Sequence, residues 1–334
     1  MTSARPRVSF IIPVRNDAAR LAGCLASLAR QACDPALVEV IVVDNGSTDA
    51  SRQVARQSGA TVLVKPSARV SDMRNAGAAA ALGDVLAFVD ADHEISSGWV
   101  SAAIGALTDA RVGAAGYPYS PPAGANWVQR RYNGLRPRPQ IGQDVLWLGS
   151  GNVAVRRSAF ERVGGFDTSL ETCEDVDLCQ RLHAAGYRLI AEPDMRSVHL
   201  GDPRRLSAVF FGELWRGRDN VRVTLRGPRT LRHLRSLLVP VADLAALALA
   251  LAALAAGAPA AAGLALLPIL ALSGLKAHAM RRHDFAWGPV QAVQALAVAV
   301  AYDMGRALAL VARATHRSRR SSENRTHVAA DSRP

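Results

Sequence analysis

Two clusters of acidic residues have the spacing expected of metal-dependent or acid–base chemistry. Asp90 and Asp92 stand one residue apart, directly after the apolar run VLAFV. Two carboxylates at this spacing can face one divalent cation, because Mg²⁺ and Mn²⁺ prefer oxygen ligands and often share them with a diphosphate. Exposed turns also produce this DxD pattern, so its meaning depends on the element that precedes it.

The second cluster places four acids within residues 171–177. Apolar residues at helical spacing follow, so the cluster begins a helix that ends near Gly186. The helix dipole stabilises one or two acids at such a position. Four carboxylates repel one another there, which favours a role for one of them as a general base beside a cationic site. His199 fits either a buried core histidine or, near a metal, a third ligand.

The elements that must position these acids follow from the apolar pattern of residues 8–89. Strands are predicted at 8–14, 38–43, 61–64 and 85–89, and helices at 16–30, 48–58 and 69–82. This alternation predicts an α/β fold with a doubly wound, mainly parallel sheet. Such a sheet binds its ligand at the carboxyl ends of its strands, and Asp44 and Asp90 both fall there.

The sequence lacks the usual glycine-rich loops that bind phosphate. Pro13-Val14-Arg15-Asn16 follows the first strand in place of a GxGxxG motif, and no GxxxxGK[ST] motif occurs. Such loops surround phosphates with backbone N–H groups. A diphosphate must therefore be held in another way, and a metal ion is the obvious candidate.

Six motifs, in this order, resemble those of family 2 glycosyltransferases of the GT-A fold. They are FIIPVRND at 10–17, VVDNGSTD at 42–49, RNAG at 74–77, FVDAD at 88–92, GGFD at 164–167 and CEDVDLCQRL at 173–182. His199 follows them, and the resemblance spans roughly residues 7–215. Six ordered motifs are far more specific than any one of them.

The resemblance implies a role for each matching residue. Asp92 is similar to the direct ligand of Mg²⁺ or Mn²⁺, with His199 as a further ligand, and Asp175 resembles the catalytic base. The residues implied in binding a nucleotide-diphosphate sugar are Pro13, Val14, Asn16, Asp44, Asn45, Arg74 and Asp90. Those implied on the acceptor or diphosphate side are Glu174, Trp215 and Arg216. Trp215 fits an anchor of an interfacial helix equally well.

The chain departs from the processive members of that family. It reads Cys-Glu-Asp where they tend to have Thr-Glu-Asp, and no QxxRW motif follows. These departures favour transfer of a single sugar over polymer synthesis. One base opposite the leaving group implies inversion at the anomeric carbon, by the geometry that governs inverting glycosidases.

The C-terminal part of the sequence points to a membrane. Residues 201–334 hold 19 basic and 8 acidic side chains, against 21 and 20 in residues 1–200. Basic segments beside apolar ones are typical of proteins at anionic lipid, so we expect membrane lipid and not nucleic acid as a partner. The run at 237–275, apolar except for Asp243, fits a hairpin of two helices that turns at Gly257-Ala258-Pro259 and either spans the bilayer or is re-entrant.

The expected organisation has five parts. They are a GT-A catalytic domain (1–203), a basic interfacial segment (204–236), the hairpin (237–275), an amphipathic or third membrane helix (276–312) and a basic disordered tail (313–334). Basic residues flank both ends of the hairpin, which places both ends in the cytosol. The apolar run at the N-terminus is too short for a signal peptide. We therefore expect the inner membrane, with a cytoplasmic catalytic domain.

The leading functional hypothesis is a metal-dependent, inverting glycosyltransferase. It would move one sugar from a nucleotide-diphosphate sugar to a lipid-linked or glycan acceptor in cell-surface or exopolysaccharide assembly. A sugar-1-phosphate nucleotidyltransferase is one alternative, but it should carry a glycine- and arginine-rich loop after the first strand, where PVRND stands. A non-catalytic basic membrane-binding protein is another, and the acids at the predicted strand ends speak against it.

Overall fold

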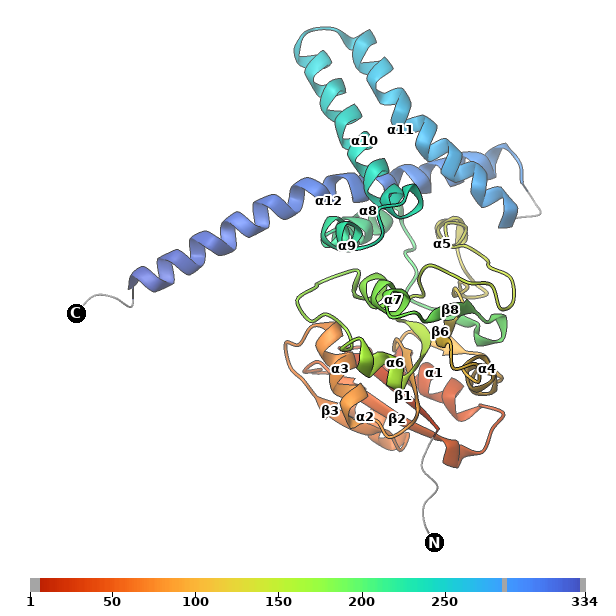
Figure 1. Ribbon diagram of the computed structural model, residues 1–334. Coiled ribbons are helices and arrows are strands. Elements are labelled where there is room, and N and C mark those ends of the chain that lie inside the picture. The colour runs from red at the N-terminus through yellow and green to blue at the C-terminus, as the bar shows by residue number, and fades with distance from the viewer. Residues whose placement is uncertain (1–6, 284–286, 331–334) are drawn as a thin grey trace. The chain divides into compact units, whose positions relative to one another are not determined.

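The computed structural model describes residues 7–283 and 287–330, without the side chains of Arg232, His283 and residues 313–330. The chain divides into two compact units (Figure 1). We call the first the sheet unit, formed by the chain up to Ala125 together with Arg136–Asp202. The second is the helical unit, formed by Asn126–Leu135 and the chain from Pro203 onward.

The sheet unit contains a seven-stranded sheet in the order β3-β2-β1-β4-β7-β6-β8. Its strands are β1 (Val8–Val14), β2 (Val38–Asp44), β3 (Thr61–Val64), β4 (Val85–Val89), β6 (Val112–Gly116), β7 (Asn152–Arg156) and β8 (Arg188–Ala191). Strands β1 to β4 pair in parallel, while β7 runs antiparallel to both β4 and β6. The mainly parallel sheet predicted from the sequence is therefore confirmed.

Helices cover both faces of this sheet. They are α1 (Ala18–Ala29), α2 (Ser51–Gln57), α3 (Val70–Ala80), α4 (Trp99–Ala106), α6 (Arg157–Arg162) and α7 (Glu174–Ala184), with the 3-10 turns η1 (Pro35–Leu37) and η2 (Pro193–Met195). Alternate residues of β1 face opposite ways, so Phe10 packs with α1 and α4, whereas Ile11 packs with α3, α6 and α7. The sheet is thus buried on both sides, as its continuous apolar strands require.

The predicted helices begin later than their spacing suggests because polar turns precede them. Asn16 has a φ of 51°, and the helix predicted from residue 16 begins at Ala18. The helix predicted from residue 48 begins at Ser51, whose backbone N–H and hydroxyl both donate to Asp49 Oδ1. Side-chain hydrogen bonds of this kind compete with helical backbone bonds at the start of a helix.

A second, two-stranded sheet lies beyond the end of β4. It pairs β5 (His93–Ile95) with β9 (Ser197–His199) in antiparallel register, with His93 opposite His199. Directly opposite residues in such a ladder carry their side chains on the same face. This register brings together two histidines that lie far apart in the sequence.

The helical unit contains the C-terminal helices and one insertion from the sheet unit's sequence. Its elements are α5 (Trp127–Asn133), α8 (Leu206–Arg216), α9 (Asn220–Arg226), α10 (Leu231–Ala255), α11 (Pro259–Met280), the 3-10 turn η3 (Arg281–His283) and α12 (Pro289–Ala330). Val128 of α5, Val209 of α8 and Val298 of α12 share one apolar core. The sequence did not predict that residues 126–135 would join this unit.

Three segments of the described chain are long and apolar enough to cross a membrane: His233–Ala255, Pro259–Met280 and Pro289–Ala312. Helices α10 and α11 form the expected hairpin, with Gly257 at a φ of 72° in the turn. Leucines along both helices are exposed, among them Leu249, Leu264 and Leu267. Exposed apolar side chains of this kind are consistent with a membrane-associated region.

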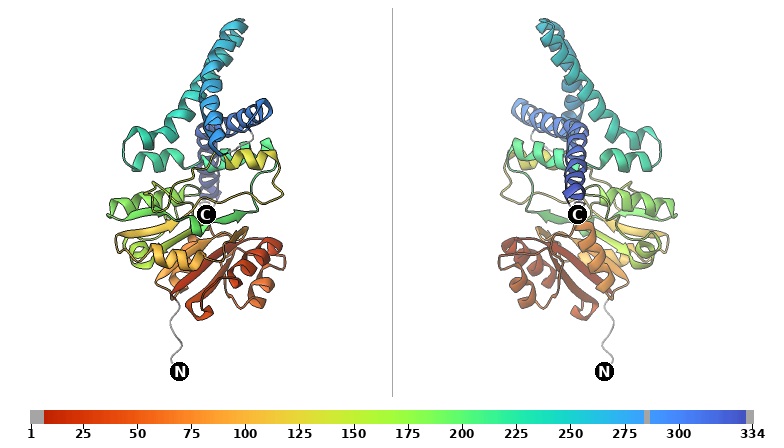
Figure 2. Two further views of the ribbon diagram at one scale, coloured as in Figure 1. Left: turned by 90° about the vertical axis from the view of Figure 1, so that its right-hand side faces the viewer. Right: turned by 90° about the vertical axis from the view of Figure 1, so that its left-hand side faces the viewer.

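Helix α12 crosses the hairpin instead of running alongside it, as Figures 1 and 2 show. It also packs along α8 of the same unit. The structure carries α12 on to Ala330, through the segment from 313 that the sequence predicts to be disordered. No proline or glycine interrupts residues 313–330, so nothing in their sequence ends the helix.

Candidate active site

Arg74 joins the two acidic clusters that the sequence singles out. Its guanidinium donates from Nη2 to Asp90 Oδ1 at 2.6 Å and from Nη1 to Glu174 Oε1 at 2.8 Å. Arg74 is 3% exposed, so both charge-assisted bonds are largely shielded from water. The DxD segment after β4 and the start of α7 are therefore held against one another by a buried cation.

The RNAG motif that carries Arg74 is built for close packing. A Cβ at Gly77 would lie 2.4 Å from Ile11 Cγ2, so only glycine lets α3 approach β1 this closely. Asn75 Nδ2 donates to Phe166 O, and Phe166 N donates to Asn75 Oδ1, both at 2.9 Å. The RNAG and GGFD motifs are thus in direct contact, and together they fix the position of Arg74.

Asp92, His93 and His199 form a cluster suited to a metal ion. Each offers one ligand atom, and the three atoms lie within 4.8 Å of one another. His199 Nε2 lies 3.2 Å from Asp92 Oδ2. A Cβ at Gly201 would lie 2.1 Å from Asp92 Oδ2 and 3.0 Å from His199 Nε2, so the backbone itself forms a wall of the cluster. One carboxylate and two imidazoles fit a transition-metal ion such as Mn²⁺ better than Mg²⁺, which prefers oxygen ligands alone.

The two histidines of this cluster differ in their affinity for protons. Burial and the nearby His199 lower the pKa of His93 to about 4. Burial alone would also lower the pKa of His199, but hydrogen bonds to Asp202 and Asp92 raise it to about 9. Burial opposes the shift at Asp92 as well, yet the hydrogen bond from His199 lowers its pKa. Without a metal, a His199 imidazolium therefore occupies the position beside Asp92 and neutralises its charge.

Asp175, the predicted base, lies at the start of α7 next to Glu174. Burial and the negative charge of Glu174 raise the pKa of Asp175 to about 7. Cys173, the residue before this helix, has a φ of 61°, a conformation that is costly for a residue other than glycine. Such strain is found where the surrounding structure enforces it, often at functional sites. A carboxylate with a raised pKa can accept a proton near neutral pH.

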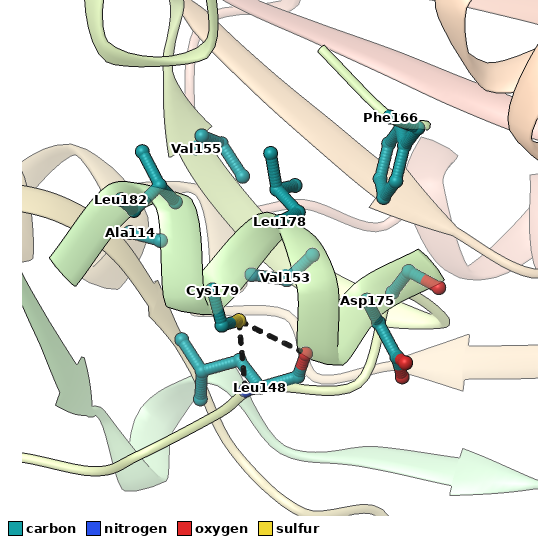
Figure 3. A pocket seen from close by; sticks show the side chains of 10 residues that line it. Ala114, Leu148, Val153, Val155, Phe166, Asp175, Leu178, Cys179 and Leu182 are labelled. Atoms are coloured by element: carbon teal, nitrogen blue, oxygen red, sulfur yellow. Dashed lines mark hydrogen bonds between the residues drawn. The ribbon is translucent and has the colours of Figure 1, made fainter. Parts of the chain in front are cut away.

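A small apolar cavity lies behind Asp175 (Figure 3). It is lined by residues such as Val153, Phe166 and Leu182, and its volume of about 10 Å³ is barely enough for one water. It is therefore no substrate pocket, and the Asp175 carboxyl points away from its apolar side chains (Figure 3). Cys179 contacts both backbone polar atoms of Leu148, which fixes the loop before β7 against α7.

The predicted nucleotide-binding residues lie at the ends of β1 and β2. Asp44 is fully buried, and its Oδ2 accepts from Ser47 N at 3.0 Å. Asp44 Oδ1 and Asn45 Oδ1 are buried without a hydrogen-bond partner. Unpaired buried acceptors are rare, and they are explained where a ligand supplies the donors.

The turn after β1 is tied to the turn after β2. Asn16 Oδ1 accepts from Thr48 N at 2.7 Å, and Asn16 N donates to Ser47 Oγ at 2.9 Å. Pro13 is half-buried and Val14 is buried at the end of β1. The structure thus brings five predicted residues together at the carboxyl ends of β1 and β2: Pro13, Val14, Asn16, Asp44 and Asn45.

Trp215 and Arg216 belong to the helical unit, where they lie at the end of α8. Trp215 is 47% exposed. Arg216 Nη1 donates to Glu213 Oε1 at 2.9 Å and to the Tyr132 hydroxyl at 3.0 Å. Arg306 donates to the other oxygen of Glu213 at 2.7 Å. Within its own unit, Arg216 is therefore part of a buried network around Glu213.

Sequence reasoning missed His93 and Asp202. His93 directly follows the DxD motif, so its position could have suggested a ligand. Asp202 Oδ1 lies 2.6 Å from His199 Nδ1. Burial opposes the shift, but hydrogen bonds from Arg136 and His199 lower the pKa of Asp202 to about 2.

Comparison with known proteins gives one family and several relatives. Residues 9–164 match the model of glycosyl transferase family 2. Glycosyltransferase AglE of Haloferax volcanii is 29% identical over 252 residues, which cover 71% of this chain and 80% of AglE. The pre-mycofactocin glycosyltransferase of Mycobacterium tuberculosis is 34% identical over 206 residues, which cover 58% of this chain and only 42% of that protein.

A solved structure shares the fold. It is the mannosyltransferase PcManGT from Pyrobaculum calidifontis, in complex with GDP-Man and Mn²⁺. It aligns with a TM-score of 0.55 and 21% sequence identity over 90% of this chain and 88% of that one. At this identity the likeness shows a shared architecture.

Proposed function

Because the chain belongs to glycosyl transferase family 2, we propose that it transfers a single sugar from a nucleotide-diphosphate sugar, with inversion and with the help of a divalent metal ion. The observation that carries this proposal is the bridge through Arg74, which joins the DxD segment to the segment of Asp175. A transferase needs a group that neutralises the leaving diphosphate and a base for the acceptor, and these two segments carry the candidates.

Asp92, His93 and His199 would hold the metal ion, and their donor set favours Mn²⁺. When bound, the ion supplies positive charge to the leaving nucleoside diphosphate. The orphaned oxygens of Asp44 and Asn45 would accept hydrogen bonds from the nucleotide. Asp90, which follows β4 and is paired with Arg74, would contact the ribose and diphosphate together with that arginine.

Asp175 would act as the base. It takes the proton of the acceptor hydroxyl while that oxygen bonds to the anomeric carbon and the bond from this carbon to the diphosphate breaks. Attack from the face opposite the leaving group inverts the anomeric carbon. A raised pKa near 7 matches the operating range of a general base. Glu174 both raises that pKa and anchors Arg74.

The acceptor that we propose is lipid-linked, in the assembly of a cell-surface glycan. Three helices of the helical unit are long and apolar enough for a membrane, and residues 204–235 hold nine arginines and two acids. Such a basic segment is attracted to anionic lipid. A catalytic unit tethered at the bilayer meets lipid acceptors at high effective concentration. We propose a cytoplasmic catalytic unit at the inner membrane, because basic residues flank both ends of the hairpin.

A binding screen tests the proposal without knowledge of the acceptor. The thermal unfolding of the purified protein would be followed with UDP-, GDP- and dTDP-sugars, each with and without Mn²⁺. We expect one nucleotide class to stabilise the protein, and only when Mn²⁺ is present. The Asp44→Ala variant should lose that shift, whereas Asp194→Asn, which changes an exposed acid, should keep it. No shift with any nucleotide sugar would contradict the proposal.

A further inference from the structure

The turn that follows β9 holds a buried acid with two cationic neighbours. The Asp202 side chain is fully buried, although it lies three residues after His199 in a polar turn. Arg136 Nη1 donates to Asp202 Oδ2 at 2.9 Å, and Arg136 Nη2 donates to Asp202 Oδ1. A carboxylate engaged by both nitrogens of a guanidinium is an ionised acceptor. Asp202 is thus fixed in position and in charge.

We propose that Asp202 is a positioning residue, which together with Arg136 fixes the ring of His199 so that Nε2 faces the metal site. This inference rests on the proposed function, because it assigns Asp202 a role at the same metal ion.

The contact with Asp202 decides which ring nitrogen of His199 is left for a metal ion. Because Asp202 only accepts, the proton of the hydrogen bond at 2.6 Å belongs to His199 Nδ1. The other nitrogen, Nε2, lies 3.2 Å from Asp92 Oδ2, so without a metal its proton faces that carboxylate. When this proton leaves, the lone pair of Nε2 is the one that a metal ion beside Asp92 would accept. Ligating histidines commonly donate their second ring N–H to a carboxylate, which sets both the tautomer and the orientation of the ring.

Aromatic contacts hold the same arrangement from the side. The Arg136 guanidinium lies 4.1 Å from the centre of the Tyr119 ring. That ring in turn packs edge-on against His93 at 4.7 Å and against His199 at 4.9 Å between ring centres. Tyr119 therefore restricts rotation of both imidazoles, while Asp202 alone selects which nitrogen of His199 faces Asp92.

His93 offers a contrast within the same cluster. Its Nδ1 lies 3.0 Å from the Ser197 hydroxyl, which can either donate or accept. A hydroxyl does not select a tautomer, so the contact leaves the His93 ring free to present either form. The carboxylate at His199 removes that freedom, so His199 is the ligand whose geometry is set in advance.

The inference is tested by a titration of the full-length protein with Mn²⁺. Electron paramagnetic resonance measures the free Mn²⁺ at each step. The variants are Asp202→Asn and His199→Ala, with Asp194→Asn as the matched control that removes one exposed acid. In Asp202→Asn the amide can donate to Nδ1 and so place the ring proton on Nε2, toward the metal. We expect its Mn²⁺ dissociation constant to rise about 10- to 100-fold, with a rise at least as large in His199→Ala and none in the control.

A spectroscopic signature separates positioning from a merely structural role. The electron spin echo of bound Mn²⁺ should show modulation from histidine nitrogen in the wild type, which weakens in Asp202→Asn even at saturating Mn²⁺. If Asp202→Asn does not fold, Arg136→Gln replaces it, with a smaller loss of affinity in the same direction. Unchanged Mn²⁺ affinity and unchanged modulation in the folded variant would overturn this inference but not the proposed function. Absence of Mn²⁺ binding to the wild type would overturn the proposed function and this inference with it.

Discussion

The acids that hold the metal cluster of the sheet unit in place are each hydrogen-bonded to an arginine, whereas one buried acid of the helical unit has no hydrogen-bond partner. Arg74 pairs with Asp90 and Glu174, and Arg136 pairs with Asp202. In the helical unit, Lys276 and the Ser273 hydroxyl bind Asp303, but both oxygens of the fully buried Asp243 lack a hydrogen-bond partner. Asp243 nevertheless interacts electrostatically with both Asp303 and Lys276.

The difference shows that the sheet unit contains two kinds of polar group: paired acids that hold its segments in place, and groups that are available to substrates. Its paired acids hold the strand ends and helix starts in place, because breaking a buried pair is strongly destabilising. The acceptors without a fixed partner, Asp44 Oδ1 and Asn45 Oδ1, lie where the nucleotide is proposed to bind. Asp175, with its raised pKa, lies where the acceptor is proposed to react. Asp243 has no such assignment, so its removal should lower neither stability nor transfer.

Removal of the metal should have the largest effect. Chelation by EDTA should reduce sugar transfer by about 1000-fold or more, because a metal contributes several kcal/mol of charge stabilisation to the transition state. Mn²⁺ should restore the rate. The measurement is release of the nucleoside diphosphate, with the unfolding temperature followed in parallel. The fold should survive chelation, since the His199–Asp92 pair neutralises the empty site. Full activity in EDTA would contradict a metal-dependent reaction.

Replacement of the base should come next. Asp175→Asn should lower kcat about 100- to 10,000-fold while the KM for the donor stays the same, because only proton transfer is lost. The variant should be at least as stable as the wild type above neutral pH. The pKa of Asp175 is higher in the folded protein than in the unfolded chain, so its ionised form costs stability at pH values above the unfolded pKa.

The matched control for this variant is Asp194→Asn, an exposed acid in the same unit. It should leave both kcat and stability unchanged. Equal loss of activity in the control, or normal kcat in Asp175→Asn, would show that Asp175 is not the base.

The helical unit offers a stability test of the comparison. Asp303→Leu leaves Lys276 without its acid and should destabilise the protein by about 3 kcal/mol. Asp243→Leu removes a carboxylate without hydrogen-bond donors, so stability should stay the same or increase. Both are read from unfolding temperatures in the same detergent micelles. If the two variants lose equal stability, Asp243 has a partner and the comparison fails.

The smallest expected effect is a change in the pH dependence of the transfer rate. The transfer rate should rise with pH through about 7, as Asp175 loses its proton. Glu174→Gln removes the negative charge that helps to raise the pKa of Asp175, so the rise should move to lower pH by about one unit. Glu161→Gln on the exposed face of α6 serves as the control and should keep the wild-type profile. A profile that stays in place in Glu174→Gln would rule out Asp175 as the titrating group.

The sequence predicted the local elements of the sheet unit well because their signals are local. Apolar runs specify β1 to β4, and the short polar segments after them specify the turns that begin beside Asp44 and Asp90. The acidic start of α7 is equally local, since acids are favoured in the first turn of a helix. The order and direction of the later strands β6, β7 and β8 were beyond such reasoning, because pairing depends on contacts far apart in the sequence.

The candidate site was predictable to the same degree. Asp90, Asp92 and Asp175 stand in motifs, whereas the bridge through Arg74 joins residues 100 positions apart. His93 and His199 meet through the register of β5 with β9, and no pattern within either segment encodes that register. Asp202 depends on Arg136, which lies in a loop without a motif. Long-range pairing of charges is a property of the folded chain.

Crystals of the protein grown with Mn²⁺ and a nucleoside diphosphate would test the central claim most directly. Anomalous scattering from Mn²⁺ locates the ion without reference to any model of the site. We predict one anomalous peak within bonding distance of Asp92 and His199, with the diphosphate bound to it and the Asp175 carboxylate facing the same ligand. A peak elsewhere, or a nucleotide bound away from Asp44 and Asp92, would contradict the account.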